Sequence, residues 1–267
     1  MRKLIIVGGF VFIALSMQAQ EKNKGTNHRL GLEMGLNEFY GNTIVPDQVR
    51  SIKSVETYES SYNDDYLGGY DYDTSHDLQK LYVGVKYEVL FSNNTIGVST
   101  GLRYFQASAK LNHNYRYEAF IWSLREDAQS SDYLSIRSIN QKNHYVSIPL
   151  EIRAFPKKRD RFFKNYFKIG GALNYRFSTD YETDFLYPQM SKHAGEVESQ
   201  IRKPCTFSGY IFPAMGFRWG RNIDPWVNLE FQFPGFLIAE RKHAFVDPRV
   251  GFGVQLSVLF SLNKKTQ

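Results

Sequence analysis

Cysteine is almost absent from the sequence. Cys205 is the only one among 267 residues, so no internal disulfide forms and the fold must be held by other means. Its position far from the N-terminus also excludes a lipid-anchored N-terminal cysteine. The net charge is +6, but the excess of Lys and Arg is scattered along the chain rather than gathered in a stripe. Nucleic acid is therefore not expected as a partner.

Long apolar runs are also missing after the first twenty residues. No stretch of eighteen apolar residues occurs there, which excludes a transmembrane helix. The mean hydropathy of −0.42 is that of a polar chain. It does not exclude a transmembrane barrel, because the inner face and the loops of a barrel are polar. The composition therefore leaves both a soluble and a membrane-embedded β protein open.

Recognisable enzyme signatures are missing as well. No histidine has a metal-ligand spacing or completes a Ser-His-Asp arrangement. The six histidines are His28, His76, His113, His144, His193 and His243. The nearest approach to a hydrolase pair is His144 with Ser147, or His243 with Asp247. No Gly-rich phosphate loop follows a strand and opens a helix. We therefore predict no catalytic residue, no cofactor and no metal.

The start of the chain is predicted to be a secretory signal. Arg2 and Lys3 provide a basic region, residues 4–15 are apolar, and residues 17–19 approximate a small-residue cleavage site. The apolar segment is too short to span a membrane as a helix. We therefore expect a signal peptide over 1–19, a short periplasmic segment over 20–27, and one folded domain over 28–267.

The stretch NHYVSIPLEIRAF, residues 143–155, alternates between two kinds of side chain. Ile148 and Leu150 belong to an apolar face, and Glu151 and Arg153 belong to the opposite face. A soluble sandwich or lipocalin-like barrel would bury the apolar face. A transmembrane barrel would press that face against lipid and turn the charges into its lumen.

The same two-faced pattern occurs eight times. The runs are 28–36, 81–89, 96–104, 143–155, 167–177, 207–219, 227–233 and 250–262. Their connections alternate between long and short. This pattern, together with the signal, predicts an all-β fold: a single antiparallel up-and-down transmembrane β-barrel of about eight strands over 28–267. Aromatic residues near the strand ends would form girdles at the membrane interfaces. They are Tyr87, Tyr104, Tyr175, Trp219 and Trp226.

The long connections are polar and rich in tyrosine, which suits recognition surfaces. They cover 37–77, 111–142, 178–204 and 234–247. Within the second, residues 119–128 would form a short helix or a strand extension. Asp71, Asp73 and Asp77 offer oxygen ligands for Ca²⁺, but the Gly and the distal Glu of a calcium loop are missing. A solvated surface loop is the favoured interpretation of 37–77.

Charged residues of both signs are predicted to face the lumen. They are Glu33, Lys86, Glu88, Arg103, Glu151, Arg153, Lys168, Arg176, Arg218 and Glu230. The interior of an eight-stranded barrel is only wide enough for side chains to fill it. Buried charges must be paired to be tolerated. We therefore expect a structural charge network that plugs the lumen, with a narrow polar conduit as the alternative.

Three stretches carry a resemblance to a known family. Residues 145–152, YVSIPLEI, resemble the most recognisable strand of the PorT-like outer-membrane β-barrel proteins, Y-L-x-I-P-L-x-x-K-Y. Arg153 and Ala154 stand where that pattern has Lys and Tyr. Residues 166–172 and 251–260 look like the family's next and closing strands. The resemblance implies an integral outer-membrane barrel, and some relatives take part in protein secretion.

The leading functional hypothesis is a non-enzymatic barrel of a Gram-negative outer membrane, with a structural or interaction role at the cell envelope. Its expected partner is outer-membrane lipid, with envelope or secretion-system proteins as further candidates. One alternative is an accessory subunit of an outer-membrane secretion assembly. The others are a rim-active hydrolase and a soluble lipocalin-like binding barrel.

Overall fold

Residues 26–50, 78–91, 95–112, 119–127, 130–156, 162–220, 225–238 and 245–262 are described by a computed structural model of the chain. The predicted signal peptide and the three aspartates of the calcium hypothesis lie outside these residues. So do His76, His113 and His243.

Eight antiparallel strands close into a barrel. They are β1 (Asn27–Thr43), β3 (Leu78–Phe91), β4 (Ile96–Asn112), β6 (Ser130–Ala154), β7 (Phe163–Phe185), β8 (Phe207–Trp219), β9 (Trp226–Gln232) and β11 (Val246–Ser261). Each pairs with the next in this order, and β11 pairs with β1, which completes the ring. The predicted up-and-down barrel of eight strands is confirmed.

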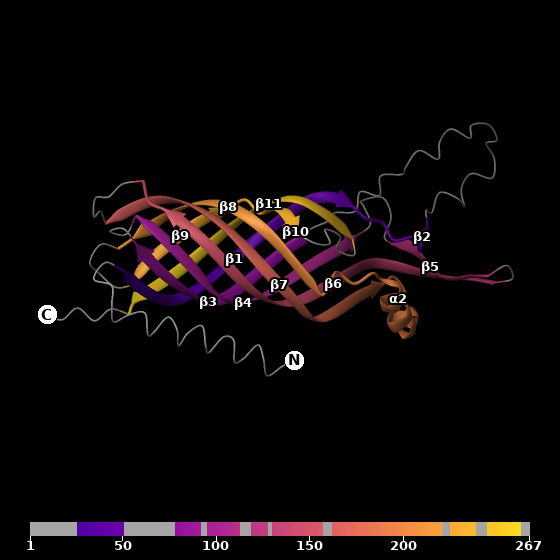
Figure 1. The fold of residues 1–267 in the computed structure, drawn as a ribbon. Helices are drawn as coiled ribbons and strands as arrows, with labels where there is room; N and C mark the ends of the chain where they lie inside the picture. The colour runs from indigo at the N-terminus through magenta and orange to yellow at the C-terminus, as the bar shows by residue number, and fades with distance from the viewer. Residues whose placement is uncertain are drawn as a thin grey trace, which may run out of the picture.

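The two ends of the barrel differ. Short connections join β3 to β4, β6 to β7 and β8 to β9 at one end, where β1 also begins and β11 ends. We call this the turn end. The four longer connections lie at the other end, the loop end, on the right in Figure 1. This arrangement follows the alternation of connection lengths in the sequence.

Smaller elements belong to the loop end. They are β2 (Val49–Arg50), β5 (Phe120–Asp127), β10 (Gly235–Ile238), the 3₁₀ helix η4 (Pro188–His193) and α2 (Ala194–Gln200). β5 pairs with the first residues of β6, so both project beyond the barrel (Figure 1). The region 119–128, for which the sequence left a helix or a strand open, is therefore mostly strand. Among the described helices, none is long and apolar enough to cross a membrane.

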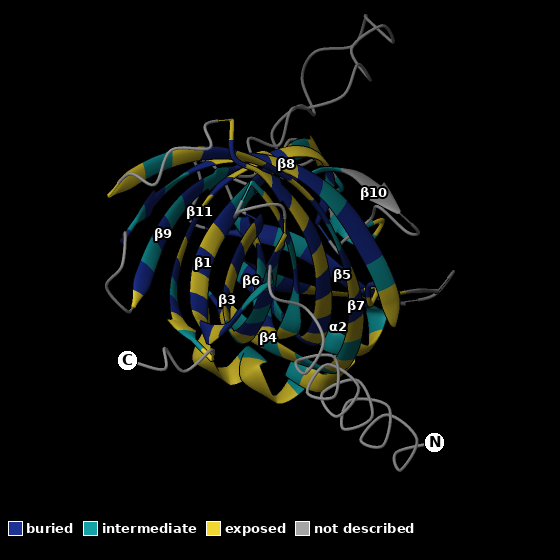
Figure 2. Ribbon diagram, turned by 60° about the vertical axis from the view of Figure 1, so that its left-hand side comes forward, coloured by how far each residue is buried: buried dark blue, intermediate teal, exposed yellow. Residues whose placement is uncertain are grey.

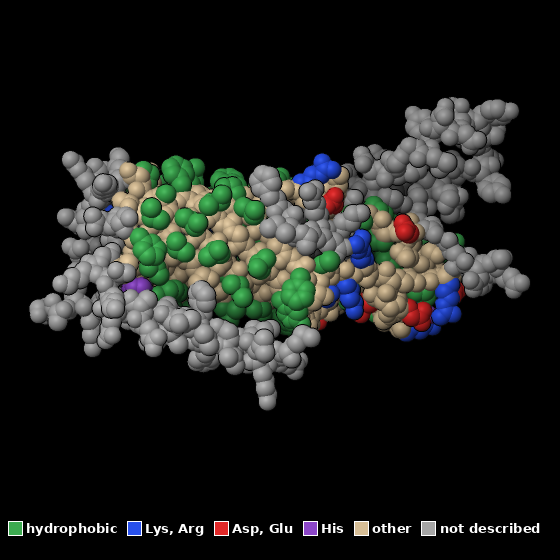
Figure 3. Space-filling model, viewed as in Figure 1, with side chains coloured by type: hydrophobic (Ala, Val, Ile, Leu, Met, Phe, Trp, Pro, Cys, Tyr) green, Lys and Arg blue, Asp and Glu red, His purple; other side chains and the backbone are tan. Residues whose placement is uncertain are grey.

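Along the barrel strands, buried and exposed residues alternate (Figure 2). Many of the exposed ones are apolar, and many of the buried ones are polar. On β1, Leu30, Leu32, Met34 and Leu36 are exposed, whereas Glu33 between them is 3% exposed. Figure 3 shows hydrophobic side chains spread over the barrel wall and charged ones gathered at the loop end. The outer wall is therefore an apolar belt.

Above this belt the pattern reverses. On β4, Leu102 is exposed and Arg103 is buried, as expected for the belt. Nearer the loop end, Ala109 and Leu111 are buried, while Lys110 between them is exposed. These inward apolar residues belong to a core that also contains Trp122 of β5 and Val197 of α2. The loop end is thus folded as in a water-soluble protein.

The reversal explains why most predicted strands were too short at the loop end. β1 continues to Thr43 instead of ending at Leu36, and β4 continues to Asn112. β6 already begins at Ser130, and β7 runs to Phe185. The prediction of polar connections over 37–43, 130–142 and 178–185 was therefore wrong. The predicted bounds of β8 agree with the structure.

Pro149 lies in the interior of β6, within the I-P-L sequence. Proline has no N–H group and cannot donate to a strand ladder. The pairing of β4 with β6 accordingly skips from Thr100 and Leu150 to Arg103 and Ser147. The Thr100 hydroxyl donates instead to the Pro149 carbonyl oxygen at 2.8 Å. A side-chain hydrogen bond therefore connects β4 and β6 where their backbone pairing is interrupted.

Candidate functional site in the barrel lumen

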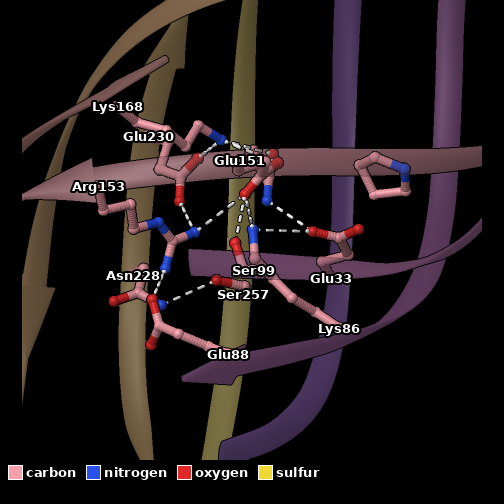
Figure 4. A network of polar contacts seen from close by, with 12 residues as sticks. Glu33, Lys86, Glu88, Ser99, Glu151, Arg153, Lys168, Asn228, Glu230 and Ser257 are labelled. Carbon is pink, nitrogen blue, oxygen red and sulfur yellow. Dashed lines mark hydrogen bonds and ion pairs between the residues drawn. The ribbon is translucent and has the colours of Figure 1, made fainter. Parts of the chain in front are cut away.

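Nine of the ten charged residues predicted to face the lumen meet in one buried network. Figure 4 shows the part of it around Glu151 and Arg153. The nine residues come from seven strands of the ring, and each is at most 3% exposed. The nine are Glu33, Lys86, Glu88, Arg103, Glu151, Arg153, Lys168, Arg218 and Glu230. Four carboxylates therefore face five cations. The strand alternation places all of them on the inner face.

Glu151 of β6 is the centre of the network. Its carboxylate forms ion pairs with the ammonium groups of Lys86 and Lys168, the latter at 3.2 Å. Arg103 Nη2 lies 2.5 Å from one of its oxygens, and Arg153 Nη2 lies 3.4 Å from the other. Four cations from β3, β4, β6 and β7 thus converge on one carboxylate.

The other carboxylates extend the network across the barrel. Glu33 of β1 pairs with Arg103 and with Lys86, the latter at 3.2 Å. Glu230 of β9 pairs with Lys168 and with Arg153, the latter at 2.5 Å. Arg153 lies on β6, three strands away from β9 around the ring, so its contact with Glu230 crosses the lumen.

Glu88 completes the network toward the turn end. Arg153 Nη1 lies 2.5 Å and Arg218 Nη2 lies 2.7 Å from its carboxylate. Arg218 also donates through Nε to Asn228 Oδ1 at 2.6 Å. Asn228 in turn donates to Ser257 Oγ at 2.9 Å. Charge and hydrogen bonding therefore continue from β3 to β11.

Neutral side chains that sequence reasoning did not single out saturate the remaining oxygens. Gln255 donates to Glu33 at 2.7 Å, and the Tyr82 hydroxyl donates to Gln255 Oε1 at 2.9 Å. Tyr166 donates to Glu230 at 2.8 Å, and Ser99 donates to Glu151 at 3.0 Å. In the sequence, only the alternation of the strands marks these side chains as inward-facing. The same alternation also marks inward glycines and alanines, so it does not single out the residues that bond to the network.

Aromatic layers enclose the network on both sides. Toward the turn end lie Leu90, Phe155, Tyr166, Trp226 and Leu259. Toward the loop end lies the aromatic layer formed by Phe39, Tyr82, Phe105, Tyr145, Tyr210 and Phe212. Cations of the network contact both layers: Arg218 lies 4.7 Å from the Phe155 ring centre, and Lys168 lies 5.0 Å from that of Phe212.

Glycines on the inner wall make room for these rings. A Cβ atom on Gly35 would lie 2.3 Å from Tyr82 Cζ, and one on Gly170 would lie 2.5 Å from Phe212 Cζ. Neither ring is able to occupy its present position opposite a larger residue. The inward glycines of the sequence are therefore part of the packing of the lumen.

Two predicted positions differ from the structure. Arg176 is only half-buried and bonds to the Pro204 carbonyl oxygen at 3.1 Å and to Thr179 Oγ1 at 2.6 Å, because it lies closer to the loop end than the network does. Trp226, predicted for an interfacial girdle, is 4% exposed and packs inside the barrel. Tyr104 and Tyr175 are exposed on the outer wall.

Two buried cations were missed. Arg29 lies with its guanidinium carbon 3.2 Å from the Trp226 ring centre. Lys80 lies on the inner face of β3, two residues before Tyr82, with its ammonium 4.2 Å from the Phe39 ring centre. Arg29 alternates with the outward residues of β1 and lies on the same face as Gly31 and Glu33. The alternation in the sequence therefore indicates that it faces the lumen. Lys80 was missed because the predicted strand began at Leu81.

The histidine pairing considered for a hydrolase is not formed. His144 lies on the outer wall, where its ring bonds to the Tyr104 hydroxyl at 2.6 Å and to Asp180 at 2.9 Å. Ser147 points inward and donates to Asn174 Oδ1 at 2.7 Å. The two side chains thus lie on opposite faces of β6. Among the described residues, no group of three His, Cys, Asp or Glu side chains is arranged to hold a metal.

The loop end carries its own fixed contacts. Gln200 of α2 accepts a bond from Trp122 Nε1 at 2.8 Å and donates to the Leu124 carbonyl oxygen at 2.9 Å, which ties α2 to β5. On the outer wall, the Lys142 ammonium donates to Glu182 at 2.8 Å. That hydrogen bond lowers the pKa of the Glu182 carboxyl below its ordinary value.

Comparison with known proteins finds a similarity only among solved structures. No family model matches the chain, and no curated sequence matches it. The chain is similar to the outer membrane protein OprG of Pseudomonas aeruginosa, with 9% identity and a TM-score of 0.43 over 89% of this chain and 94% of that one.

It is also similar to Ail, the attachment invasion locus protein of Yersinia pestis, solved in complex with the heparin analogue sucrose octasulfate. There the identity is 8% and the TM-score 0.32, over 89% of this chain and 97% of that one. A further structure of Ail gives 10% identity and a TM-score of 0.30, over 90% and 100% of the two chains. The likeness concerns the fold and no further property.

Proposed function

We propose that the chain is an integral outer-membrane β-barrel with a closed lumen, which serves a structural or interaction role at the cell envelope. The observation that carries this proposal is the inverted placement of side chains in the barrel wall. Residues such as Leu32, Leu150 and Leu173 are 65%, 61% and 68% exposed, while nine charged side chains are buried inside. A water-soluble barrel would be arranged the other way round. Lipid is the partner that this exterior suits.

The connection lengths set the proposed orientation. Short turns face the periplasm in barrels of this kind, and long loops face the outside of the cell. The turn end, where β1 begins and β11 ends, would therefore be periplasmic. The loop end, with α2 and the β5–β6 hairpin, would face outward. This orientation agrees with export by the signal peptide predicted over 1–19.

The closed lumen is supported by the contacts that cross it. Glu33 on β1 and Glu230 on β9 are joined through Glu151, Lys86 and Lys168. An ion passing through would have to separate these pairs and also pass the aromatic layers on both sides. Separating buried ion pairs costs several kcal/mol. The lumen thus holds the wall together, and no conduit is needed to explain its charges.

The interaction role is assigned to the loop end. Val197 of α2 is fully buried against the core that contains Trp122, so the cap is held in one position. The outer face of β6 and β7 next to it is polar, with Lys142, Asp180 and Glu182. A rigid polar surface suits recognition of another envelope component. Membership in the PorT-like family, and with it a role as an accessory secretion subunit, stays a prediction from residues 145–152.

Two measurements on the same preparation test the proposal. Envelope fractions extracted in mild detergent and run unheated on a gel should give a band that shifts on boiling. The purified barrel should then insert into planar bilayers without discrete conductance steps. Recovery in the soluble fraction without a heat shift would contradict the membrane assignment. Regular conductance steps would contradict the closed lumen. A larger unheated species, identified by mass spectrometry, would name a partner.

A further inference from the structure

Lys80 is a buried cation that pairs with no carboxylate of the described residues. It is 5% exposed and lies on the inner face of β3, above the charge network. Its ammonium faces the rings of Phe39, Tyr210 and Phe105, whose centres lie at 4.2, 5.1 and 5.7 Å. Within the described part of the chain, no carboxylate and no hydrogen-bond acceptor pairs with it. Aromatic faces offset only part of the cost of burying a charge.

Asn37 is a second unsatisfied group beside it. Asn37 on β1 is the register partner of Lys80 on β3, and both side chains lie on the inner face. Asn37 is fully buried, yet neither its amide nitrogen nor its amide oxygen has a hydrogen-bond partner in the described structure. Directly opposed side chains lie with Cβ atoms about 5 Å apart. A cationic donor and a neutral donor thus lie next to each other inside the barrel.

The buried charges in the lumen also do not balance. The network contains four carboxylates and five cations, and Lys80 adds a further buried cation. Six cations minus four carboxylates leave an excess of two positive charges among these described residues. A buried excess of this kind calls for an anion, because water supplies hydrogen bonds but no charge.

We propose that the lumen binds a compact monovalent anion between Lys80 and Asn37. The Lys80 ammonium supplies the charge, and the Asn37 amide N–H supplies a directed hydrogen bond. Phe39, Phe105 and Tyr210 form the apolar wall around the site. The ligand is a halide ion or the carboxylate of a small apolar acid, since both present one negative charge to one ammonium group. The site rests on the membrane barrel proposed above, whose wall buries Lys80 and Asn37.

Thermal unfolding of the detergent-folded protein tests the site. The folded fraction is measured from the gel shift at constant ionic strength, while sodium gluconate is replaced stepwise by chloride, bromide, acetate or hexanoate. Gluconate carries five hydroxyl groups, which the apolar wall of Phe39, Phe105 and Tyr210 does not accommodate. The wild type should gain about 3 °C in midpoint for each tenfold rise in anion above its Kd, because the ligand binds only the folded barrel. Lys80→Met should show no dependence on any of the anions.

Lys110→Met is the matched control, because Lys110 is an exposed lysine on β4. It removes the same charge and should keep the wild-type dependence. Asn37→Ala should keep the dependence with a weaker apparent affinity. A halide response identifies the inorganic ion, and a response to acetate or hexanoate alone identifies a carboxylic acid. A wild type that is insensitive to all four anions, or a Lys80→Met variant that responds like the wild type, would overturn the site.

Bromide scattering gives a readout that does not depend on a variant. Crystals of the wild type grown in sodium bromide should show an anomalous peak beside Lys80 Nζ when halide raises the midpoint, and a halide response without that peak would overturn the site. Conductance and fractionation report on the proposed function separately. A conducting barrel that still shows the Lys80-dependent anion response would reject the closed lumen and keep the anion site.

Discussion

At the scale of single residues, the lumen depends on complete pairing. Glu151 contacts four cations that are all at most 3% exposed, so none has water as an alternative partner. A buried ion pair adds little net stability over an apolar pair of the same shape, but removal of one partner is strongly destabilising. The network therefore adds little net stability, but it favours the one arrangement of the eight strands in which every charge is paired.

Glu151→Gln should destabilise the folded barrel by about 3–5 kcal/mol, because it leaves Lys86, Arg103 and Lys168 without their shared carboxylate. The heat-shift midpoint and urea unfolding in detergent measure the loss. Glu182→Gln is the control, since this carboxylate has one lysine partner at the surface. It should leave both midpoints unchanged. Equal effects of the two changes would contradict a tightly packed charge network.

Gly35→Ala should destabilise the barrel by about 1–3 kcal/mol through overpacking, because the new Cβ atom would lie 2.3 Å from the Tyr82 ring. Gly195→Ala in α2 is the control. Nothing lies within 4 Å of a Cβ atom there, and alanine favours a helix, so this variant should be neutral or slightly more stable. The same unfolding assay compares them. A harmless Gly35→Ala would mean that Tyr82 has room to move.

At the scale of the elements, each long strand belongs to two environments. The belt half of β4 has apolar Leu102 outside and Arg103 inside, and the upper half has Lys110 outside and Ala109 inside. The alternation predicted the number, direction and inner face of the strands, because it is strict within the belt. It did not predict the loop-end halves of these strands. Their outward residues are polar and their inward residues are small, and such a sequence resembles a loop when the elements that pack against it are unknown.

Leu150→Arg should block assembly or cost about 2–4 kcal/mol, because Leu150 lies exposed in the middle of the belt on β6. Ser178→Arg, on the outer wall of β7 beside Asp180 and above the belt, should be tolerated. The folded fraction after refolding into lipid vesicles measures both. Ser147→Arg is not a suitable control, because Ser147 is 1% exposed and bonded to Asn174. Equal folding of Leu150→Arg and Ser178→Arg would argue against the belt.

Val197→Asp should release the cap at the loop end, because Val197 is the buried contact of α2 with the upper core. Limited proteolysis should then cut within 186–206 at a faster rate, while the heat-shift midpoint of the barrel stays near that of the wild type. Glu196→Ala, at an exposed position of the same helix, should not change the rate. If Val197→Asp lowered the barrel midpoint by as much as Glu151→Gln, the cap would be part of the barrel core.

At the scale of the whole molecule, the interior is built in layers along the barrel axis. An apolar layer at the turn end is followed by the charge network, the aromatic layer and the core of the loop end. The ten predicted lumen charges follow from strand parity alone, and nine of them meet. Their pairing does not follow from parity, because contacts such as Arg218 with Glu88 join residues 130 apart in sequence and depend on how the ring closes.

The reversal of the outer wall also fixes how deeply the molecule sits in a bilayer. On β1 the exposed Leu and Met residues lie between His28 and Glu38, which spans roughly 33 Å of strand and about 25 Å across a membrane at a typical tilt. A thicker bilayer would have to thin around the barrel, since the outer face of β6 and β7 above the belt carries Lys142, Asp180 and Glu182. Hydrophobic mismatch should therefore favour membranes with short acyl chains and resist partition into thicker ones.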